Sequence, residues 1–196
     1  MTRPDIAAAA ALMARAFGDD PMMGWVVPHA PARPRALGAF FAANVRYADL
    51  YGRVDLAPDD GGAAIWLAPG DYRMTPWRML RSGHALLPLR MGAPSWRRLR
   101  RLNAYALMQH ARTVAGPHWY LYGVGIASDR RRRGLATALL RPALDQADRD
   151  RLPCYLETAN PLTLPLYERL GFRVAIPGRL PSDGPPLWSM LRPAKR

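Results

Sequence analysis

The sequence has few of the residues that build covalently linked or metal-stabilised proteins. Among its 196 residues there is one cysteine, Cys154, which excludes an intramolecular disulfide and a cysteine-rich zinc site. The four histidines show no metal-ligand spacing, so we expect no bound metal. No uncharged apolar run reaches about 18 residues, so we expect no transmembrane helix. With 49% hydrophobic residues, the chain is expected to form one domain with its own core.

Lysine and glutamate are nearly absent, although the chain is strongly basic. Lys195 is the only lysine, Glu157 and Glu168 are the only glutamates, and the net charge is +13. The arginine excess is also what a GC-rich genome would give, but it predicts attraction to polyanions such as phosphorylated cofactors, nucleic acid or acidic lipid. Residues 6–14 loosely resemble a signal peptide, but Asp5 stands where positive charge is needed. We therefore expect a cytoplasmic protein.

Hydrophobic periodicity, capping residues and turn residues predict the elements along the chain. A turn is expected at 19–21 and a hairpin turn at 58–62, and the basic face of the helix at 95–113 is either a solvated surface or a nucleic-acid or partner surface. Strands that alternate with helices after residue 119 indicate a mixed α/β sheet. The expected helices are 5–17, 34–49, 76–88, 95–113, 133–149 and 160–170, and the expected strands are 52–57, 63–68, 119–126, 154–157, 172–176 and 187–191.

The run of arginines at 130–133 carries the first chemical signal. A strand ends at Ile126, a polar loop follows, and a helix begins with small residues at Gly134 and Ala136. The free N–H groups and the dipole of a helix start bind anions, so this pattern predicts a pyrophosphate cradle without a Walker motif. The alternative is a basic helix start with nothing bound. In the preceding strand, Gly123 and Gly125 indicate either a bulge that frees N–H groups or a tightly packed strand.

Two polar residues further along the chain stand at helical spacing. Asn160 lies at a strand-to-helix junction, and Tyr167 follows two helical turns later. Asn160 could simply cap the helix, and Tyr167 could simply pack in the core. Tyr167 could also protonate a leaving thiolate, because a phenol is a neutral acid at pH 7.

These motifs together resemble a known family. The strand, then R-x-x-G-x-A from Arg131, then N-x6-Y-x3-G-F from Asn160, resembles the GNAT superfamily of acetyl-CoA-dependent N-acetyltransferases. The string LPCYLETANPLTLPLYERLGFRV, the segment HWYL and Pro142 inside a helix are similar to the puromycin N-acetyltransferases and their bacterial relatives. The specific motifs cover residues 118–191, whereas the N-terminal half is similar only in layout. Ser128 and Ala136 depart from the commoner residues, and the usual first strand is missing or very short.

The resemblance implies an α/β (α+β) fold of the GNAT type in one domain over residues 1–196. Its mixed, mostly antiparallel sheet is splayed at the cofactor site and flanked by helices, with the acceptor side in 1–117 and the acetyl-CoA side in 118–191. No metal is implied. Tyr167 is implied as the general acid. Glu157 is the only plausible glutamate for the base, unless it is structural, and water relayed to backbone carbonyls is the alternative base. The residues implied in acetyl-CoA binding are Val124, Gly125, Ile126, Arg131, Arg132, Arg133, Gly134, Leu135, Ala136, Thr137 and Asn160.

The implied reaction is transfer of an acetyl group to the amine of a small, perhaps antibiotic-like, molecule. Aromatic side chains with an acid suit a cationic amine, although they equally suit the edge of a core. The alternatives are a non-catalytic acyl-CoA or nucleic-acid-binding module and a protein N-acetyltransferase. We expect no membrane partner, consider nucleic acid an unlikely one, and leave a homodimer open. The candidate acceptor-binding residues are Asp19, Asp20, Trp25, Trp66 and Tyr72.

Overall fold

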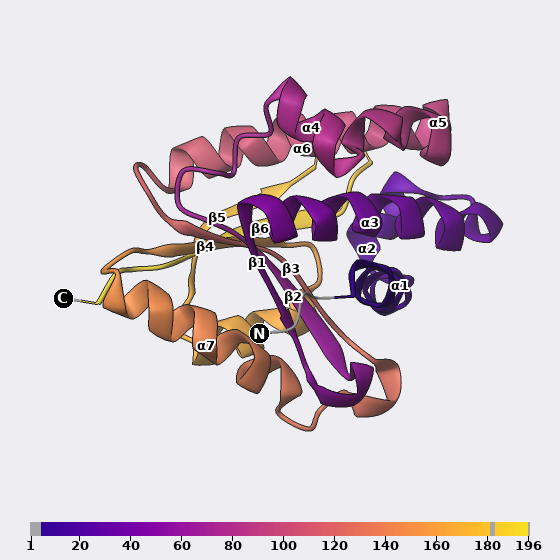
Figure 1. Cartoon of the computed structure of the whole chain (residues 1–196). Coiled ribbons are helices and arrows are strands. Elements are labelled where there is room, and N and C mark those ends of the chain that lie inside the picture. Colours follow the sequence, from indigo (N-terminus) through magenta and orange to yellow (C-terminus); the bar gives the residue numbers. More distant parts are fainter. Residues whose placement is uncertain (1–4, 181–182, 196) are drawn as a thin grey trace.

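A computed structural model describes residues 5–180 and 183–195. It contains one six-stranded sheet in the order β1-β2-β3-β4-β6-β5 (Figure 1). β3 and β4 pair in parallel and every other neighbouring pair is antiparallel, so the predicted mixed, mostly antiparallel sheet is confirmed. The strands are β1 (Gly52–Leu56), β2 (Gly62–Leu67), β3 (Trp119–Ile126), β4 (Cys154–Thr158), β5 (Arg173–Arg179) and β6 (Pro186–Arg192).

Helices cover both faces of this sheet. No helix in the described ranges is long and apolar enough to cross a membrane. The α-helices are α1 (Ile6–Ala16), α2 (Pro21–Val26), α3 (Arg33–Tyr51), α4 (Pro76–Ser82), α5 (Leu87–Met91), α6 (Ala93–Thr113), α7 (Leu135–Arg149) and α8 (Leu164–Arg169). The short 3-10 turns are η1 (Ala30–Ala32), η2 (Pro58–Asp60), η3 (His84–Leu86), η4 (Ser128–Arg130) and η5 (Pro161–Thr163).

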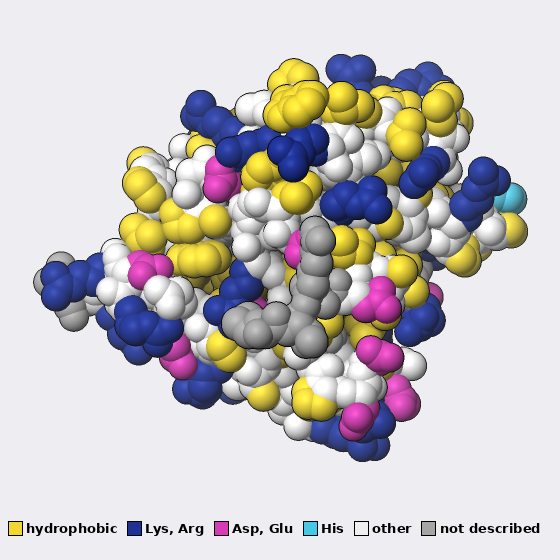
Figure 2. Space-filling view, in the orientation of Figure 1, with side chains coloured by type: hydrophobic (Ala, Val, Ile, Leu, Met, Phe, Trp, Pro, Cys, Tyr) yellow, Lys and Arg dark blue, Asp and Glu magenta, His cyan; other side chains and the backbone are white. Residues whose placement is uncertain are grey.

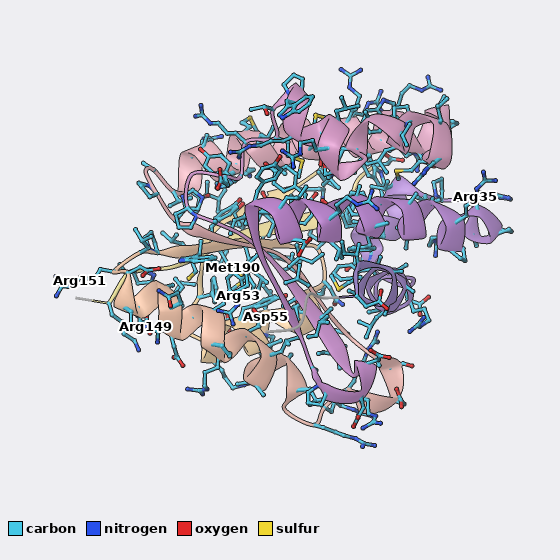
Figure 3. The ribbon with its side chains drawn as sticks, in the orientation of Figure 1. Arg35, Arg53, Asp55, Arg149, Arg151 and Met190 are labelled. Carbon is cyan, nitrogen blue, oxygen red and sulfur yellow. The ribbon has the colours of Figure 1, made fainter. Side chains whose placement is uncertain are left out.

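Two hydrophobic clusters lie on opposite faces of the sheet, and β2 separates them. Ile65 belongs to the cluster formed with α1, α2, α3, α5 and α6, whereas Trp66 belongs to the cluster beneath α7. Met190, labelled in Figure 3, is buried in this second cluster. Because side chains alternate along a strand and both faces are covered, all residues of β2 are buried.

In the N-terminal half, local sequence signals place most elements but not all. Asp5 caps α1 as predicted, since its carboxylate accepts from the N–H groups of Ala7 and Ala8. The turn predicted at 19–21 lies at 17–19 instead, because Asp20 caps a further helix, α2, that begins at Pro21. The helix predicted at 76–88 is wrong as one element. Gly83, at φ 87°, ends α4 in the left-handed conformation, and η3 and α5 follow.

In the C-terminal half, the predicted strands and helices are present with shifted ends. β3 has the predicted bounds, whereas α7 begins at Leu135 rather than at residue 133. The helix predicted at 160–170 is a 3-10 turn followed by the short helix α8. β5 continues to Arg179, so the loop before β6 is shorter than predicted. The expectation of a missing or very short strand before the first helix concerns residues 1–4, which lie outside the described residues.

Candidate active site

The sheet opens between β3 and β4. Their parallel pairing covers only Trp119–Leu121 on β3, although β3 continues to Ile126. The β2–β3 register shifts between Ile65 and Trp66, which leaves Tyr122 as the extra residue of a bulge. From this point onward, β3 has an edge that β4 does not cover.

The open edge presents backbone donors. The N–H of Ala127 bonds to the carbonyl oxygen of Gly61 on the β2 side at 3.0 Å. Because bonding directions alternate along an antiparallel strand, the N–H groups of Val124 and Ile126 point away from β2, toward the open edge. This is the arrangement that the sequence predicts for a bulged strand.

The two glycines of β3 also have a packing role. A Cβ atom on Gly125 would lie 2.8 Å from Sδ of Met13 and 2.9 Å from Cβ of Ala16. One on Gly123 would lie 3.2 Å from Cε of Met13. The missing side chains therefore let α1 lie close against β3, so the tight-packing reading of these glycines also holds.

The loop before α7 forms a second group of free donors. Arg132 has φ 62° and Gly134 has φ 77°, so the backbone turns twice through the left-handed region before the helix begins. Within the described ranges, the N–H groups of residues 131–137 donate to no acceptor, and no side chain caps α7. Concave runs of N–H groups at a helix start bind anions.

The arginines of this loop differ in their contacts. Arg131 donates from Nη2 to the carbonyl oxygen of Ala16 at 3.1 Å and from Nε to that of Ile126 at 3.4 Å. It therefore fixes the loop against the ends of α1 and β3. Arg132 and Arg133 are exposed and have no ion pair among the described residues, so their charges are free to attract an anion.

Asn160 has the capping role that the sequence left open. Its Oδ1 accepts from the N–H of Leu162 at 3.0 Å at the start of η5, and its own N–H donates to Oγ1 of Thr158. The side-chain amide nitrogen makes no hydrogen bond within the described part of the chain, so it remains able to donate to a ligand.

Tyr167 combines burial with a hydroxyl that is free to donate. The residue is 7% exposed and packs edge-on against Phe172 in the cluster beneath α7. Its hydroxyl makes no hydrogen bond to another described residue, so it is able to donate to a ligand. Burial raises the pKa of the Tyr167 phenol, and the negative charge of Asp20 raises it further. The phenol therefore stays protonated at neutral pH.

Glu157 lies on the other face of the sheet, close to where β3 and β4 part. Tyr120 donates to its Oε2 at 2.6 Å, and Tyr155 donates to its Oε1 at 2.8 Å. Burial raises the pKa of the Glu157 carboxyl, while these two hydrogen bonds lower it. Glu157 is therefore a half-buried acid whose charged form is stabilised by hydrogen bonds from two phenols.

A largely apolar pocket surrounds this carboxylate. The lining comes from the C-cap of α1, from α2, α3 and α6, and from β3, β4 and β6, and Glu157 is the one acidic residue among the described residues that line it. It consists of Phe17, Met22, Met23, Phe40, Phe41, Leu102, Asn103, Ala106, Tyr120, Tyr122, Glu157 and Leu187. Such a pocket suits a molecule with one positive charge and an apolar body.

The five predicted acceptor residues do not line this pocket. Asp19 is exposed on a separate groove between α1 and α3, whereas the carboxylate of Asp20 is committed to the N–H groups of Met22 and Met23. Trp25 bonds through its indole N–H to Asp183. Asp20 nevertheless lies close enough to Tyr167 to act on its pKa.

The prediction for Trp66 is wrong, because this side chain is fully buried on the opposite face of the sheet, beneath α7. Tyr72 packs on His110 and His118, with ring centroids 4.6 and 5.1 Å away. Neither side chain reaches the carboxylate pocket.

The aromatic residues beside Glu157 were not predicted as part of the site, although the sequence contains a signal for them. Tyr120 and Tyr122 stand two apart on β3, and Tyr155 and Glu157 stand two apart on β4. The β3–β4 register pairs Tyr120 with Tyr155, so all four share one face. Knowing which strands are neighbours was the missing information.

Comparisons with known proteins agree with this geometry. The profile of the acetyltransferase (GNAT) family matches residues 93–172, from the start of α6 to just before β5. An uncharacterised N-acetyltransferase from Schizosaccharomyces pombe is 26% identical over 174 residues, which are 86% of this chain and 70% of that protein.

Two solved structures share the architecture along almost their whole length. A histone acetyltransferase HPA2 and related acetyltransferase from Corynebacterium glutamicum superposes with a TM-score of 0.66 at 28% identity, covering 100% of this chain and 94% of that one. Arylalkylamine N-acetyltransferase 2 from Aedes aegypti superposes with a TM-score of 0.63 and covers 100% and 97%, but its 12% identity makes it a likeness of fold alone.

Proposed function

We propose that this chain, which has the GNAT fold and is an acetyl-CoA-dependent N-acetyltransferase, acetylates the primary amine of a small molecule with an apolar body. The observation that carries this proposal is the pocket in which Glu157 is the one acidic residue among aromatic and aliphatic side chains. A monocationic amine would leave its charge on the carboxylate and its apolar part on the phenylalanines.

The residues present fit acetyl-CoA. The free N–H groups of residues 132–137 and the charges of Arg132 and Arg133 would hold the pyrophosphate. The edge N–H groups of Val124 and Ile126 would hold the pantetheine arm and the carbonyl oxygen of the acetyl group, with the free amide of Asn160 beside them. When bound, acetyl-CoA supplies an acetyl group already activated as a thioester.

The protein's own part is proton transfer and positioning. An amine must lose its proton before it can attack, and the Glu157 carboxylate is the group in the pocket that can accept it. Tyr167, protonated on the other face of the sheet, would give a proton to the departing thiolate. The two groups thus flank the opening between β3 and β4, where amine and thioester would meet.

The residues that line the proposed acceptor pocket come from both predicted portions of the chain. Phe17, Phe40 and Phe41 come from the region 1–117, whereas Tyr120, Tyr122 and Glu157 come from 118–191. We therefore propose a single domain whose acceptor pocket closes between these two portions.

The test is thiol release from acetyl-CoA in the presence of an amine panel. The panel contains an arylalkylamine, puromycin (included because of the sequence resemblance), spermidine and a short peptide with a free N-terminus. We expect turnover with the apolar amines and little with spermidine, which brings several charges to one carboxylate. Turnover with the peptide alone would instead make the chain a protein N-acetyltransferase.

The roles of the two candidate groups are tested on the best amine. Tyr167→Phe should lower kcat about a hundredfold or more, because it removes a general acid. Tyr51→Phe is the matched control, since this α3 tyrosine packs against Tyr47 and Arg78 away from the pocket. Equal activity of both variants would contradict the role of Tyr167.

A further inference from the structure

One stretch of the chain carries most of the net charge and has no acidic residue. Residues 72–128 contain nine arginines and neither aspartate nor glutamate, against a net charge of +13 for all 196 residues. In the structure this stretch forms α4, α5, α6 and β3. Its outer helices therefore present positive charge that the same stretch cannot neutralise.

The part of this stretch at residues 76–91, which we call the 76–91 surface, also exposes large apolar side chains. Trp77 is 65% exposed and Leu80 60% exposed on α4, while Leu86 is 45% exposed and Leu89 83% exposed on η3 and α5. Figure 2 shows hydrophobic atoms along the top of the molecule, over α4 and α5, with arginine side chains among them.

The sequence spacing places the arginines beside these apolar groups. Arg81 follows Leu80 directly, and Arg90 follows Leu89. Both arginines are exposed and have no ion pair among the residues that the structure describes. Arg78 differs, since it pairs with Asp71 at 2.6 Å and covers the ring of Tyr51. The 76–91 surface thus combines unneutralised charge with exposed apolar area, which is costly in water.

We propose that the 76–91 surface docks on an anionic lipid surface. Trp77, Leu80 and Leu89 would enter the boundary between headgroups and acyl chains, and Arg81 and Arg90 would meet lipid phosphates. This is peripheral binding, so it is compatible with the absence of a spanning helix among the described residues. It revises the expectation from the sequence that the chain has no membrane partner.

Other occupants fit this surface less well. A second copy docked through the same surface would bring arginine against arginine, because the stretch 72–128 has no acid to face them. The phosphates of a nucleic acid could pair with the arginines of this surface. However, residues 76–91 contain neither asparagine nor glutamine, whose side-chain amides hydrogen-bond to bases. Neither a second copy nor a nucleic acid would cover the exposed tryptophan and leucines as a lipid boundary does.

The proposed docking leaves the enzyme accessible to its cosubstrate. In Figure 1, α4 and α5 lie along the top of the molecule, whereas the start of α7 and the loop before it lie at the bottom. A molecule seated on a membrane by its 76–91 surface would therefore present the residue 131–137 loop to the water phase.

The experiment is co-sedimentation of the full chain with two kinds of vesicle. One is pure phosphatidylcholine, and the other contains phosphatidylglycerol in addition. We expect retention on the anionic vesicles only. The double variant R81Q/R90Q should bind about tenfold more weakly, because each arginine near such a surface adds to binding, and L89S should also weaken retention by removing an inserted side chain.

Matched variants distinguish this surface from the general charge of the protein. R141Q/R149Q removes the same charge from α7, where Arg149 lies away from the 76–91 surface (Figure 3), and L162S removes a leucine that is 86% exposed elsewhere. Both should bind like the unaltered protein.

Several results would overturn the proposal. They are no retention on anionic vesicles, equal loss for R141Q/R149Q, no effect of L89S, tighter binding to a DNA duplex than to vesicles, or burial of the 76–91 surface in a dimer seen by sedimentation.

Discussion

The hydroxyl groups of Tyr120 and Tyr155 should set the pH at which Glu157 becomes active. Each hydrogen bond stabilises the carboxylate and lowers its pKa against the opposing effect of burial. A base works above its pKa, so losing one bond should move the acid limb of the kcat/KM profile to higher pH. We predict that shift for both Tyr120→Phe and Tyr155→Phe, measured as kcat/KM against pH with the best amine.

Tyr122→Phe is the control for this pair. Tyr122 lines the same pocket, but its hydroxyl donates no hydrogen bond to Glu157 in the described structure. Its loss can change KM without moving the acid limb. An equal shift in all three variants would mean that the limb reports the pocket's general polarity and not the two bonds to the carboxylate.

At the scale of elements, the contact between α1 and β3 should respond sharply to a single methyl group. A Cβ at position 125 would come within 3.0 Å of both Met13 and Ala16, so α1 would have to move away from β3. We predict that Gly125→Ala lowers the free energy of unfolding by about 1–3 kcal/mol, the usual effect of overpacking. Urea titration measures this change.

Gly38→Ala is the control for that urea titration, because the same substitution is expected to have the opposite effect there. Gly38 lies inside α3, and a Cβ there would meet nothing within 4 Å. Gly38→Ala should therefore stabilise the protein by roughly 0.5–1 kcal/mol, because alanine loses less entropy in a helix. If Gly125→Ala were equally stabilising, close packing would not be the reason for that glycine.

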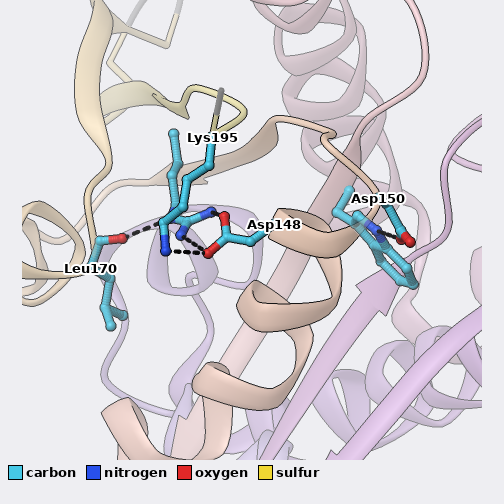
Figure 4. A network of polar contacts seen from close by, with 6 residues as sticks. Asp148, Asp150, Leu170 and Lys195 are labelled. Carbon is cyan, nitrogen blue, oxygen red and sulfur yellow. Dashed lines mark hydrogen bonds and ion pairs between the residues drawn. The ribbon is translucent and has the colours of Figure 1, made fainter.

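A charged cluster joins α7 to β6 and the C-terminal segment. Asp148 accepts from Nη1 of Arg192 at 2.6 Å and from Nη2 at 2.8 Å, and Nζ of Lys195 lies 2.6 Å away (Figure 4). These cations, Arg192 first, lower the pKa of the Asp148 carboxyl to about 2. A depressed pKa means stability that is present above the ordinary aspartate value of 3.8 and is lost as pH falls toward 2.

We therefore predict that Asp148→Asn removes this acid-dependent loss and lowers stability at neutral pH by roughly 1–3 kcal/mol, because Arg192 is left with unpaired donors. Unfolding free energies across this pH range measure both effects. Asp150→Asn is the neighbouring control, since this residue is exposed and, among the described residues, accepts only from neutral groups, the indole N–H of Trp119 (Figure 4) and the side-chain amide of Gln146. If the slope of unfolding free energy against pH were unchanged in Asp148→Asn, other carboxyl groups would be the cause of the loss of stability in acid.

The sequence predicts elements well where the deciding signal is local. The strand at 119–126 and the cap at Asp5 follow from nearby residues and were placed correctly. The helix at 76–88 failed because nothing in its periodicity shows that Gly83 takes a left-handed conformation in mid-segment. α2 was missed because Asp20-Pro21 reads equally as a turn and as a cap followed by a first helical residue.

The parts of the site that lie in continuous sequence motifs could be predicted, whereas the parts assembled from separate segments could not. The residue 131–137 loop, Asn160 and Tyr167 follow one another in one half of the chain and could be singled out together. Trp66 could not be placed, because β2 is buried on both faces and its pattern does not reveal which face a side chain occupies. The phenylalanines of the pocket come from α1 and α3, and only tertiary packing brings them to Glu157.

At the scale of the whole molecule, buried histidines should make stability fall in mildly acidic solution. Burial lowers the pKa of His84 to about 4 and, together with the nearby His118, lowers that of His110 to about 4. Both rings are neutral in the fold but charge readily in the unfolded chain, whose value is 6.5. Their stabilising effect is therefore complete above pH 6.5 and is lost as pH falls toward 4, by an amount of order 3 kcal/mol for His84.

Denaturant titrations through this pH range test the prediction, because the slope of unfolding free energy against pH counts the protons taken up on unfolding. His84→Asn should give a shallower slope even if its stability at neutral pH is lower, since one proton acceptor is gone. His29→Asn, at an exposed position before η1, should leave the slope unchanged. A slope that His84→Asn does not reduce would assign the acid sensitivity to His110 and His118, whose Nε2 atoms lie 2.6 Å apart in the buried pair.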